Sequence, residues 1–261
     1  MNFFTDKTAL ITGSTSGIGL GIAHALAAEG ANIILNGFGE TSLIDEIKTE
    51  LRHTYHVRVT HDGADCAQAT DVSRMVQDSG GVDILVNNAG IQHVAPIETF
   101  PVEKCEAIIA INMMSNWHAI RAALPYMKQQ GWGRIINISS AHGLTASPFK
   151  SAYVMAKHGV MGLTKAVALE VAENKDWDIT ANAICPGYAA TPLVEAQLKN
   201  QMGTYGISRD EVMAKIMLGR QPQGEFVTVE EVGGIATFLC TPSARKITGA
   251  AISVDGGWTA M

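Results

Sequence analysis

The sequence predicts a single α/β domain, residues 1–261, in which a doubly wound parallel sheet carries helices on both faces. Two features indicate this class. Seven short apolar runs alternate with longer segments of helical spacing along the whole chain. The run at residues 82–86 is apolar enough for a strand that is buried on both faces, as in a parallel sheet. No linker, internal repeat or low-complexity segment interrupts the series.

Composition narrows the range of functions. With 47% hydrophobic residues the chain can bury a full core, and a formal charge of −6 with a pI near 5.7 gives no reason to expect nucleic acid. The four cysteines are far apart and show no zinc-type spacing, so we expect reduced thiols and no metal site. The N-terminus has no signal-peptide pattern, and no run reaches transmembrane length. We therefore expect a cytoplasmic protein without membrane contact.

The first strand is expected at residues 8–11, and a glycine-rich turn follows it over residues 12–19. Apolar residues then continue at helical spacing. Glycines permit a tight turn close to a ligand, and a helix N-terminus offers free N–H groups and a positive dipole end to a pyrophosphate. Three residues separate Gly13 from Gly17, which departs from the G-x-G-x-x-G fingerprint, so a purely structural turn is the alternative.

The second strand, Asn32–Asn36, ends in Gly37-Phe38-Gly39, where an enzyme selective for NAD often carries an acidic residue. No acid stands at that point. No Arg or Lys occurs at residues 14–16 or between residues 37 and 47 either, so the 2′-phosphate of NADP would lack a counter-ion. The sequence therefore favours NAD.

A helix is expected over residues 41–54, and the third strand over residues 57–61. Asp65 follows that strand. It either accepts a hydrogen bond from the adenine amino group or caps the N-terminus of the next helix.

The fourth strand, residues 82–86, ends at Asn87-Asn88-Ala89-Gly90, whose small residues allow a cofactor to pass closely. One long helical pattern then covers residues 103–130. Asn112 lies inside this pattern among apolar residues, and a buried amide needs partners. It either bonds the next strand or holds a water that relays protons.

The fifth strand, residues 133–138, places Ser140 just beyond its carboxyl end, where open α/β sheets bind ligands. In the helix expected over residues 152–171, Tyr153 and Lys157 are four residues apart and share one face. A free phenol has a pKa of about 10, so ionisation at neutral pH needs a shift of about 2–3 units. A neighbouring Lys⁺ and a positively charged nicotinamide ring favour that shift. Such a pair alone is weak evidence, because it also occurs on ordinary helix surfaces.

The helix at 152–171 has small or apolar residues on nearly all sides, more than one sheet face can cover. Its far side is therefore expected to pack on another subunit.

After a sixth strand at 179–184, a helical excursion over about residues 191–219 is too long for an ordinary connection. We expect it to be a lid over the ligand. A last helix over 228–240 and a last strand over 251–254 complete the series.

Together these motifs resemble the short-chain dehydrogenase/reductase family over almost the whole length. Each motif is modest alone, but their order and spacing are specific. The matched positions are Thr12-Gly13, Gly17-Ile18-Gly19, Asn87-Asn88-Ala89-Gly90, Asn112, Ser140, Tyr153, Lys157, Pro186-Gly187, Thr191 and Asp255-Gly256-Gly257. The resemblance implies a Rossmann-like seven-stranded parallel sheet, usually in a homotetramer, and catalysis by Asn112, Ser140, Tyr153 and Lys157.

The resemblance also implies roles for individual residues. Tyr153 is expected to be the general base, Ser140 to bind the substrate oxygen, Lys157 to lower the phenol pKa and hold the nicotinamide ribose, and Asn112 to anchor a water for proton release. The residues expected to contact the cofactor are Gly13, Thr15, Ser16, Ile18, Phe38, Asp65, Asn88, Gly90, Tyr153, Lys157, Pro186 and Thr191.

Within that family the chain is most similar to the bacterial D-3-hydroxybutyrate dehydrogenases. Residues 36–39, Gln92, His142, Lys150, Gln197 and Trp258 carry this likeness. It implies reversible, NAD-dependent oxidation of (R)-3-hydroxybutyrate to acetoacetate. The residues expected to contact this small substrate are Gln92, Ser140, His142, Lys150, Tyr153, Tyr188, Gln197 and Trp258. Tyr188 departs from the expected Trp, which indicates a slightly larger or more polar methyl pocket.

Plain structural interpretations stand beside these roles. Lys150 suits a solvated loop, His142 a polar turn, Gln92 and Gln197 the surface, and Trp258 ordinary packing. Two other functions share the core motifs. A 3-oxoacyl carrier-protein reductase would use NADPH and have a basic docking face, and a non-catalytic scaffold would bind a dinucleotide without turnover.

Overall fold

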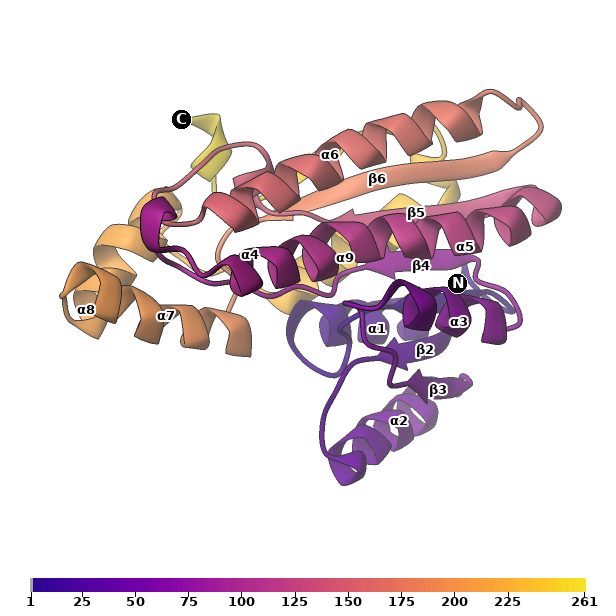
Figure 1. Cartoon of the computed structure of the whole chain (residues 1–261). Coiled ribbons are helices and arrows are strands. Elements are labelled where there is room, and N and C mark those ends of the chain that lie inside the picture. Colours follow the sequence, from indigo (N-terminus) through magenta and orange to yellow (C-terminus); the bar gives the residue numbers. More distant parts are fainter. Residues whose placement is uncertain (1) are drawn as a thin grey trace.

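The computed structural model describes residues 2–261, with all of their side chains except those of Pro192, Leu193, Ala196, Gln197 and Lys199. Seven strands form one sheet in the order β3-β2-β1-β4-β5-β6-β7, and all neighbouring strands run parallel. Helices cover both faces of the sheet (Figure 1). The predicted α/β class and seven-stranded parallel sheet are confirmed.

The order of the strands locates the ligand crevice. The strands are β1 (Thr8–Ile11), β2 (Asn32–Asn36), β3 (Val59–Asp62), β4 (Ile84–Asn87), β5 (Trp132–Ile138), β6 (Asp178–Pro186) and β7 (Ala251–Val254). From β1 the chain first winds outward to β2 and β3, and then returns to the other side of β1 with β4. This reversal leaves a crevice at the carboxyl ends of β1 and β4, the usual ligand position in such sheets.

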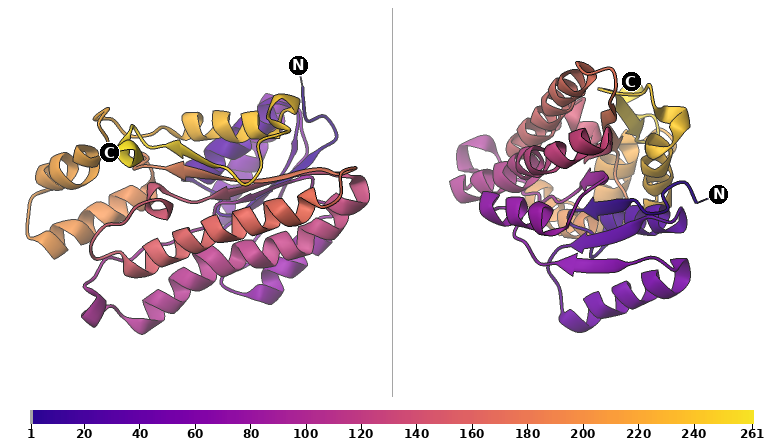
Figure 2. Two further views of the ribbon diagram at one scale, coloured as in Figure 1. Left: turned by 90° about the horizontal axis from the view of Figure 1, so that it is seen from above. Right: turned by 90° about the vertical axis from the view of Figure 1, so that its right-hand side faces the viewer.

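Six helices form the layers on the two faces. On one face lie α1 (Gly17–Ala28), α2 (Thr41–Tyr55) and α9 (Val229–Cys240), and on the other α3 (Ala69–Asp78), α5 (Ser115–Gln130) and α6 (Ser151–Ala172) (Figure 2). Each layer has its own apolar core, because alternate strand residues face opposite sides. Ala9 and Ile11 pack with the first layer, and Leu10 packs with the second.

One predicted helix is interrupted. The single helix expected over residues 103–130 is α4 (Val102–Ile109), then a π-helical turn η2 (Ala110–Met114), and then α5. π-helical turns are rare and occur often at functional sites, because they redirect side chains and leave backbone groups free. This turn carries Asn112, which is fully buried.

The excursion expected to form a lid is helical. It consists of α7 (Pro192–Tyr205), α8 (Arg209–Glu211), the π-helical turn η4 (Val212–Met217) and the short η5 (Leu218–Arg220). These elements project beyond the carboxyl ends of the strands, in orange on the left of Figure 1. Apolar residues of the excursion, including Leu198 and Met217, pack against Tyr188 and Trp258. The excursion therefore forms a wall of the crevice.

The remaining turns are 3₁₀ helices. They are η1 (Ile97–Thr99), η3 (Ala141–Gly143), η6 (Pro242–Ala244) and η7 (Trp258–Ala260).

Within the described residues, no helix has the length and apolar character needed to cross a bilayer. The same residues contain no cluster of three or more His, Cys, Asp or Glu side chains that could bind a metal ion.

Candidate active site

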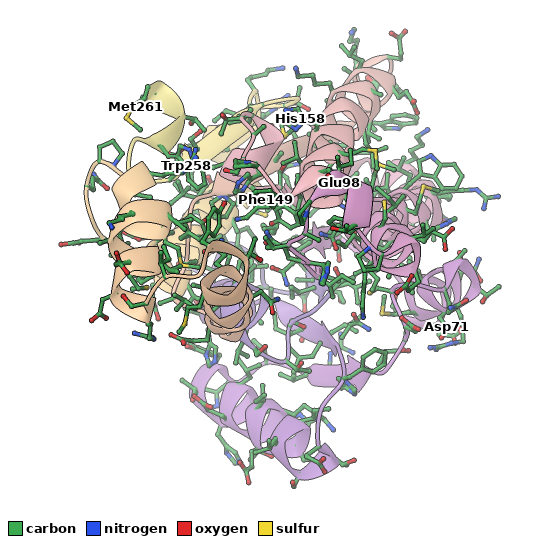
Figure 3. All side chains as sticks on the ribbon, turned by 60° about the vertical axis from the view of Figure 1, so that its left-hand side comes forward. Asp71, Glu98, Phe149, His158, Trp258 and Met261 are labelled. Carbon is green, nitrogen blue, oxygen red and sulfur yellow. The ribbon has the colours of Figure 1, made fainter. Side chains whose placement is uncertain are left out.

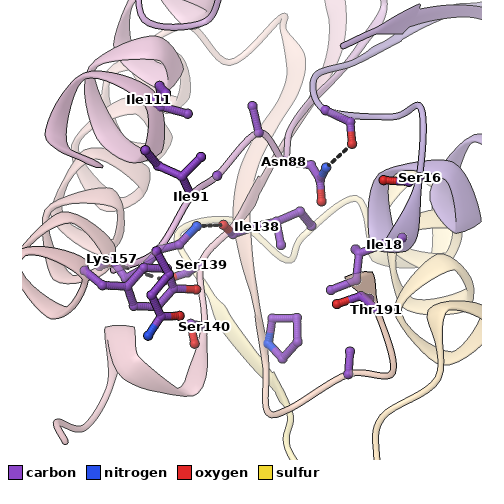
Figure 4. A pocket seen from close by; sticks show the side chains of 18 of the residues that line it. Ser16, Ile18, Asn88, Ile91, Ile111, Ile138, Ser139, Ser140, Lys157 and Thr191 are labelled. Carbon is purple, nitrogen blue, oxygen red and sulfur yellow. Dashed lines mark hydrogen bonds between the residues drawn. The ribbon is translucent and has the colours of Figure 1, made fainter. Parts of the chain in front are cut away.

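One cavity of about 420 Å³ runs along the carboxyl ends of the strands, from the glycine turn after β1 to the start of α6 (Figure 4). Most residues expected in the site line it. They are Gly13, Thr15, Ser16, Ile18, Phe38, Asp65, Asn88, Gly90, Gln92, Ser140, His142, Lys150, Tyr153, Lys157, Pro186, Tyr188, Thr191 and Trp258. Asn112 lies behind the lining, and the side chain of Gln197 falls outside the described part of the chain.

Amide side chains at the strand ends hold the glycine turn. Asn36 Oδ1 accepts a hydrogen bond from Gly13 N at 3.2 Å, and its Nδ2 donates to two carbonyls at and just beyond the end of β3, at 3.0 and 2.9 Å. Asn88 Nδ2 donates to the carbonyls of Thr12 and Gly13, both at 2.8 Å. These bonds join β1, β2, β3 and β4, so the turn is fixed before any ligand binds.

The glycine turn is shaped to bring a ligand close to the backbone. Gly13 has φ +62°, and a Cβ on Gly19 would lie 2.4 Å from the Gly13 carbonyl oxygen and 2.5 Å from Asn88 Nδ2. The N-cap residue of α1, Ser16, makes no side-chain cap hydrogen bond, and the first turn holds no acid. The helix therefore presents its first N–H groups to the cavity, which suits a phosphate.

The opposite rim of the turn carries the residues expected near adenosine. Thr15 Oγ1 donates to the Phe38 carbonyl at 3.1 Å, and the Phe38 side chain is 69% exposed. Asp65 Oδ1 accepts from Ala67 N at 2.8 Å, while the N-cap position of α3 is Gln68. The N-cap role for Asp65 is wrong, because its carboxylate closes an Asx turn before the helix begins.

Ser140, Tyr153 and Lys157 come together at the other end of the cavity. Tyr153 and Lys157 are 9% and 4% exposed, and they lie on one face of α6. Lys157 Nζ is 5.6 Å from the centroid of the Tyr153 ring and donates to the Ile138 carbonyl at 2.7 Å, a bond drawn in Figure 4. Ser140 Oγ accepts from His142 N at 3.2 Å, which orients the hydroxyl at the start of η3.

The electrostatics of this group differ from the sequence-based expectation. Burial raises the pKa of Tyr153 to about 12, although hydrogen bonding with Ser140 opposes the rise. Burial also lowers the pKa of Lys157 to about 8. Lys157 is not among the groups that shift the phenol pKa in the protein without ligands, and its predicted effect together with a charged nicotinamide ring stays a prediction. Its ammonium group is bound to the Ile138 carbonyl, and desolvation of the phenolate has the larger effect.

One alternative expected Asn112 to bond the next strand. The structure shows that it bonds the segment after β4. Its Oδ1 accepts from Ile91 N and its Nδ2 donates to the Ile91 carbonyl, both at 2.9 Å. Ile91 follows the Asn-Asn-Ala-Gly turn and lines the cavity. Asn112 thus fixes the segment after β4 from behind, and one lone pair and one N–H of its amide are left over.

Lys150 is not a solvated loop lysine. It is 3% exposed, and its Nζ donates to the Tyr188 hydroxyl oxygen at 2.9 Å. Burial, and next the charge of Arg220, lower the pKa of Lys150 to about 7. Gln92 lines the same cavity, and its Nε2 is buried without a hydrogen-bond partner in the described residues, so Gln92 is not a simple surface amide either. Both lining residues therefore have hydrogen-bond donors to spare.

Three aromatic rings form the wall around Lys150. The Tyr188 and Trp258 rings stack at 5.3 Å with an interplanar angle of 14°, and His142 meets Trp258 edge-on at 4.9 Å. His142 is 3% exposed, and burial, assisted by the charge of Lys150, holds its pKa well below the usual value. A neutral His142 contributes a hydrogen-bonding group to this end, without a charge. Trp258 is both a packing residue and part of the cavity wall.

Two residues that hold the wall were given no role in the site from the sequence, although Asp255 belongs to the matched Asp-Gly-Gly motif. Gln221 Oε1 accepts a hydrogen bond from Tyr188 N. Asp255 accepts bonds from Gly257 N and Thr259 N, both at 3.0 Å, and thereby fixes the turn that carries Trp258. The Asp-Gly-Gly sequence gave a turn signal for Asp255. For Gln221 the sequence held no signal, because its partner lies 33 residues away.

The family model described as enoyl-(acyl carrier protein) reductase matches residues 13–259, nearly the whole chain. The chain belongs to the short-chain dehydrogenase/reductase family.

This short-chain dehydrogenase/reductase is 56% identical over 259 residues to the D-beta-hydroxybutyrate dehydrogenase of Rhizobium meliloti, with 98% of this chain and 99% of that protein covered. It is 54% identical to the D-beta-hydroxybutyrate dehydrogenase of Cupriavidus necator, with 98% of each covered. A solved structure of a variant actinorhodin polyketide ketoreductase with NADPH superposes with a TM-score of 0.89 at 31% identity, and 98% of each chain is covered. The family uses a nicotinamide dinucleotide, which the glycine cradle and uncapped α1 fit.

Substituting Gly19→Ala should weaken dinucleotide binding at least tenfold, because the added Cβ would push on the Gly13 carbonyl and the Asn88 amide. Titration of intrinsic fluorescence with NADH measures this. Gly234→Ala is a matched control, since a Cβ there meets nothing within 4 Å and α9 gains helix propensity. Equal affinity in the two variants would show that the turn does not approach the dinucleotide.

Proposed function

We propose that the protein catalyses the reversible, NAD-dependent oxidation of (R)-3-hydroxybutyrate to acetoacetate. The observation that carries this proposal is the buried cluster of hydrogen-bond donors next to the catalytic group. Lys150 has one bond through its ammonium, and Gln92 Nε2 has none in the described residues. Among the described residues that line the cavity the only carboxylate is Asp65, which lies at the adenosine end. Buried donors without an acceptor suit a substrate carboxylate.

The position of this cluster selects the substrate class. Lys150 is the residue before α6 begins, three positions before Tyr153. A carboxylate held there lies a short distance from a hydroxyl held at Tyr153, as in a small 3-hydroxy acid. A site built around unpaired polar groups rejects an alcohol that lacks the carboxylate, because those groups would stay unpaired. The two D-beta-hydroxybutyrate dehydrogenases that share more than half of this sequence support the assignment.

The chain's own residues divide the work at the reacting carbon. Tyr153 Oη takes the proton of the substrate hydroxyl in oxidation and returns it in reduction. Ser140 hydrogen-bonds the substrate oxygen, and Lys157 holds the ribose hydroxyls and adds positive charge beside the phenol. The nicotinamide dinucleotide, when bound, accepts the carbinol hydride. Loss of the hydride and the hydroxyl proton turns the hydroxy acid into a 3-oxo acid.

Burial keeps the phenol of Tyr153 protonated in the protein without ligands. With a pKa of about 12 the phenol is protonated at neutral pH, so it is ready to donate a proton in reduction. Oxidation requires the phenolate. While the pH stays below the pKa of the phenol, each increase of one pH unit raises the phenolate fraction about tenfold. Asn112 serves as a positioning residue for the segment after β4, and its spare hydrogen-bonding sites suit a water that carries the proton away.

The adenosine end of the cavity favours NAD. The only lysines or arginines among the described lining residues are Lys150 and Lys157, and both lie at the catalytic end. Phe38 and its glycine neighbours border the site where a 2′-phosphate would lie, so that dianion would find no cation. The ketoreductase named with NADPH shares the fold, and its cofactor choice does not transfer on fold alone.

The rival functions have less support. In the helical excursion, the exposed cations Arg209 and Lys215 form ion pairs with Glu195 and Glu211 at 2.9 and 2.8 Å, so these two described cations are not available as a basic docking face for a carrier protein. A non-catalytic scaffold would have no use for a buried Ser-Tyr-Lys group with a donor cluster beside it.

We also propose a cytoplasmic homotetramer. Several large apolar side chains are exposed on the helices that cover the sheet, more than packing within one chain explains. They are Trp117 on α5, Met155 and Leu169 on α6, and Phe238 on α9, at 44%, 53%, 71% and 43% exposure.

The function is tested by a spectrophotometric screen of 3-hydroxy acids, both enantiomers, with NAD⁺ and NADP⁺. The expected result is turnover of (R)-3-hydroxybutyrate with NAD⁺, with the (S)-enantiomer and NADP⁺ at least tenfold less effective. An acetoacetyl thioester with NADPH tests the reductase rival in the same assay. A preference for that pair would replace the proposal.

Substituting Tyr153→Phe removes the proton acceptor and should lower kcat at least 100-fold, since general acid–base catalysis contributes about 10²–10⁴-fold. NADH binding should be retained, because the ring stays in place. Tyr126→Phe, on α5 away from the cavity, serves as the control. A Tyr153→Phe enzyme with more than a tenth of wild-type kcat would rule out the phenol as the base.

Substituting Lys150→Met keeps the buried stem but removes the ammonium. KM for hydroxybutyrate should rise on the order of 30-fold, since loss of a hydrogen bond to a charged group costs about 1.5–3 kcal/mol. Lys215→Met removes an exposed lid cation and is the matched control. Steady-state kinetics at pH 6.5, where Lys150 is mostly charged, measure the effect. Unchanged KM would remove Lys150 from the substrate site.

A further inference from the structure

A column of two cations and two rings runs through the wall of the cavity, with Arg220 at the end that does not line the cavity. Arg220 Cζ lies 5.8 Å from the Trp258 ring centroid, Trp258 stacks on Tyr188 at 5.3 Å, and Lys150 Nζ lies 5.0 Å from the Tyr188 ring centroid. The four residues come from the end of the lid, the C-terminal turn, the loop after β6 and the start of α6. Figure 3 shows Trp258 where the C-terminal segment meets the lid.

Arg220 is an unneutralised charge in this column. No Asp or Glu lies within ion-pair distance of it, and none of the side chains left undescribed is acidic. Its backbone is well anchored, because the next residue, Gln221, bonds Tyr188 N and donates to the Glu225 carbonyl. The side chain of Gln221 thus ties the segment that carries Arg220 to the loop after β6.

The charge of Arg220 acts on Lys150 across the two rings. Arg220 is the second cause, after burial, of the lowered pKa of Lys150, and it acts on His142 in the same direction. No acidic side chain contributes to either shift. Among the described residues, the titratable or charged groups that act on members of this column or on His142 and Tyr153 beside it are His142 on η3, Tyr153 and His158 on α6, Tyr188 after β6, Tyr205 on α7 and Arg220 on η5.

We propose that Arg220 is a positioning residue that controls substrate binding from behind the wall. It seats Trp258 through its cation–π contact and sets the pH above which Lys150 stops binding a carboxylate. The inference rests on the proposed function, because it concerns the substrate of that same site. Arg220 itself does not line the cavity.

The sign of the effect follows from the charges. A positive neighbour disfavours a second positive charge, so Arg220 lowers the pKa of Lys150 and makes the ammonium lose its proton at a lower pH. Above that pH the free enzyme must take up a proton to bind the carboxylate, and KM rises about tenfold per pH unit. Removing the charge of Arg220 must move this alkaline rise to higher pH.

The test is the pH profile of KM for (R)-3-hydroxybutyrate, from pH 6 to 9.5 with saturating NAD⁺, in wild type, R220Q, R220H and R220K. In R220Q the rise of KM at alkaline pH should move to a pH that is higher by roughly half a unit to one unit. This is the usual effect of one charge on the order of 10 Å away. The side chain introduced by R220H is neutral above about pH 6.5–7.5, so this variant should shift the rise of KM in the same direction. R220K keeps the positive charge and should keep the wild-type profile. Arg245→Gln, an exposed surface change, is the control.

The outcomes separate the two proposals. A wild-type enzyme with turnover but a flat KM profile, or neutral variants with the wild-type profile, would overturn the role of Arg220 and leave the proposed function standing. A shift in R220K as large as that in R220Q would also overturn it, since packing alone would then explain the change. A wild-type enzyme that uses no hydroxybutyrate at any pH would end the proposed function, and this inference with it.

Discussion

The site depends on the hydrogen bonds that tie together the carboxyl ends of the parallel strands. The Asn36 side chain bonds both the glycine turn and the end of β3, and the Asn88 side chain bonds the turn from just beyond the end of β4. Thr12 Oγ1 completes the tie, because it accepts from Asn88 N and Ala89 N at 2.9 and 3.0 Å. A parallel sheet brings all its carboxyl ends to one edge, but those ends are loops, and loops are ordinarily mobile. Here the amides hold them, so the cradle is formed in advance.

Desolvation then shapes the chemistry at the other end of the cavity. Tyr153, Lys157 and Lys150 are all buried, and burial is the largest cause of each pKa shift. It opposes charge on every group, so the phenol becomes less acidic while both ammonium groups become easier to deprotonate. Both ammonium groups are therefore brought close to their titration range near neutral pH. A ligand of opposite charge favours the ionised form of a side chain whose ionisation burial had disfavoured. Ligand binding is therefore linked to the protonation of these side chains.

The helical excursion proposed as a lid forms one side of the crevice with apolar residues. It ends at Arg220, and Arg220 and the following Gln221 contact Trp258 and Tyr188. The substitution of Tyr188 for the expected Trp gives Lys150 an oxygen to bond, which an indole ring would not supply at that point. The donor cluster and the lid are thus joined through one phenol.

The sequence alone determined the sheet, the glycine cradle and the shared face of Tyr153 and Lys157. These depend on local periodicity, on turn residues and on spacing within one helix, all of which are legible along the chain. Tertiary structure decided what those groups do. The Asn112–Ile91 bonds at the π-helical turn and the Lys150–Tyr188 bond depend on contacts between distant segments. So does the direction of the Tyr153 pKa shift, because burial is set by the packing of the whole fold and leaves no signal in the spacing of residues.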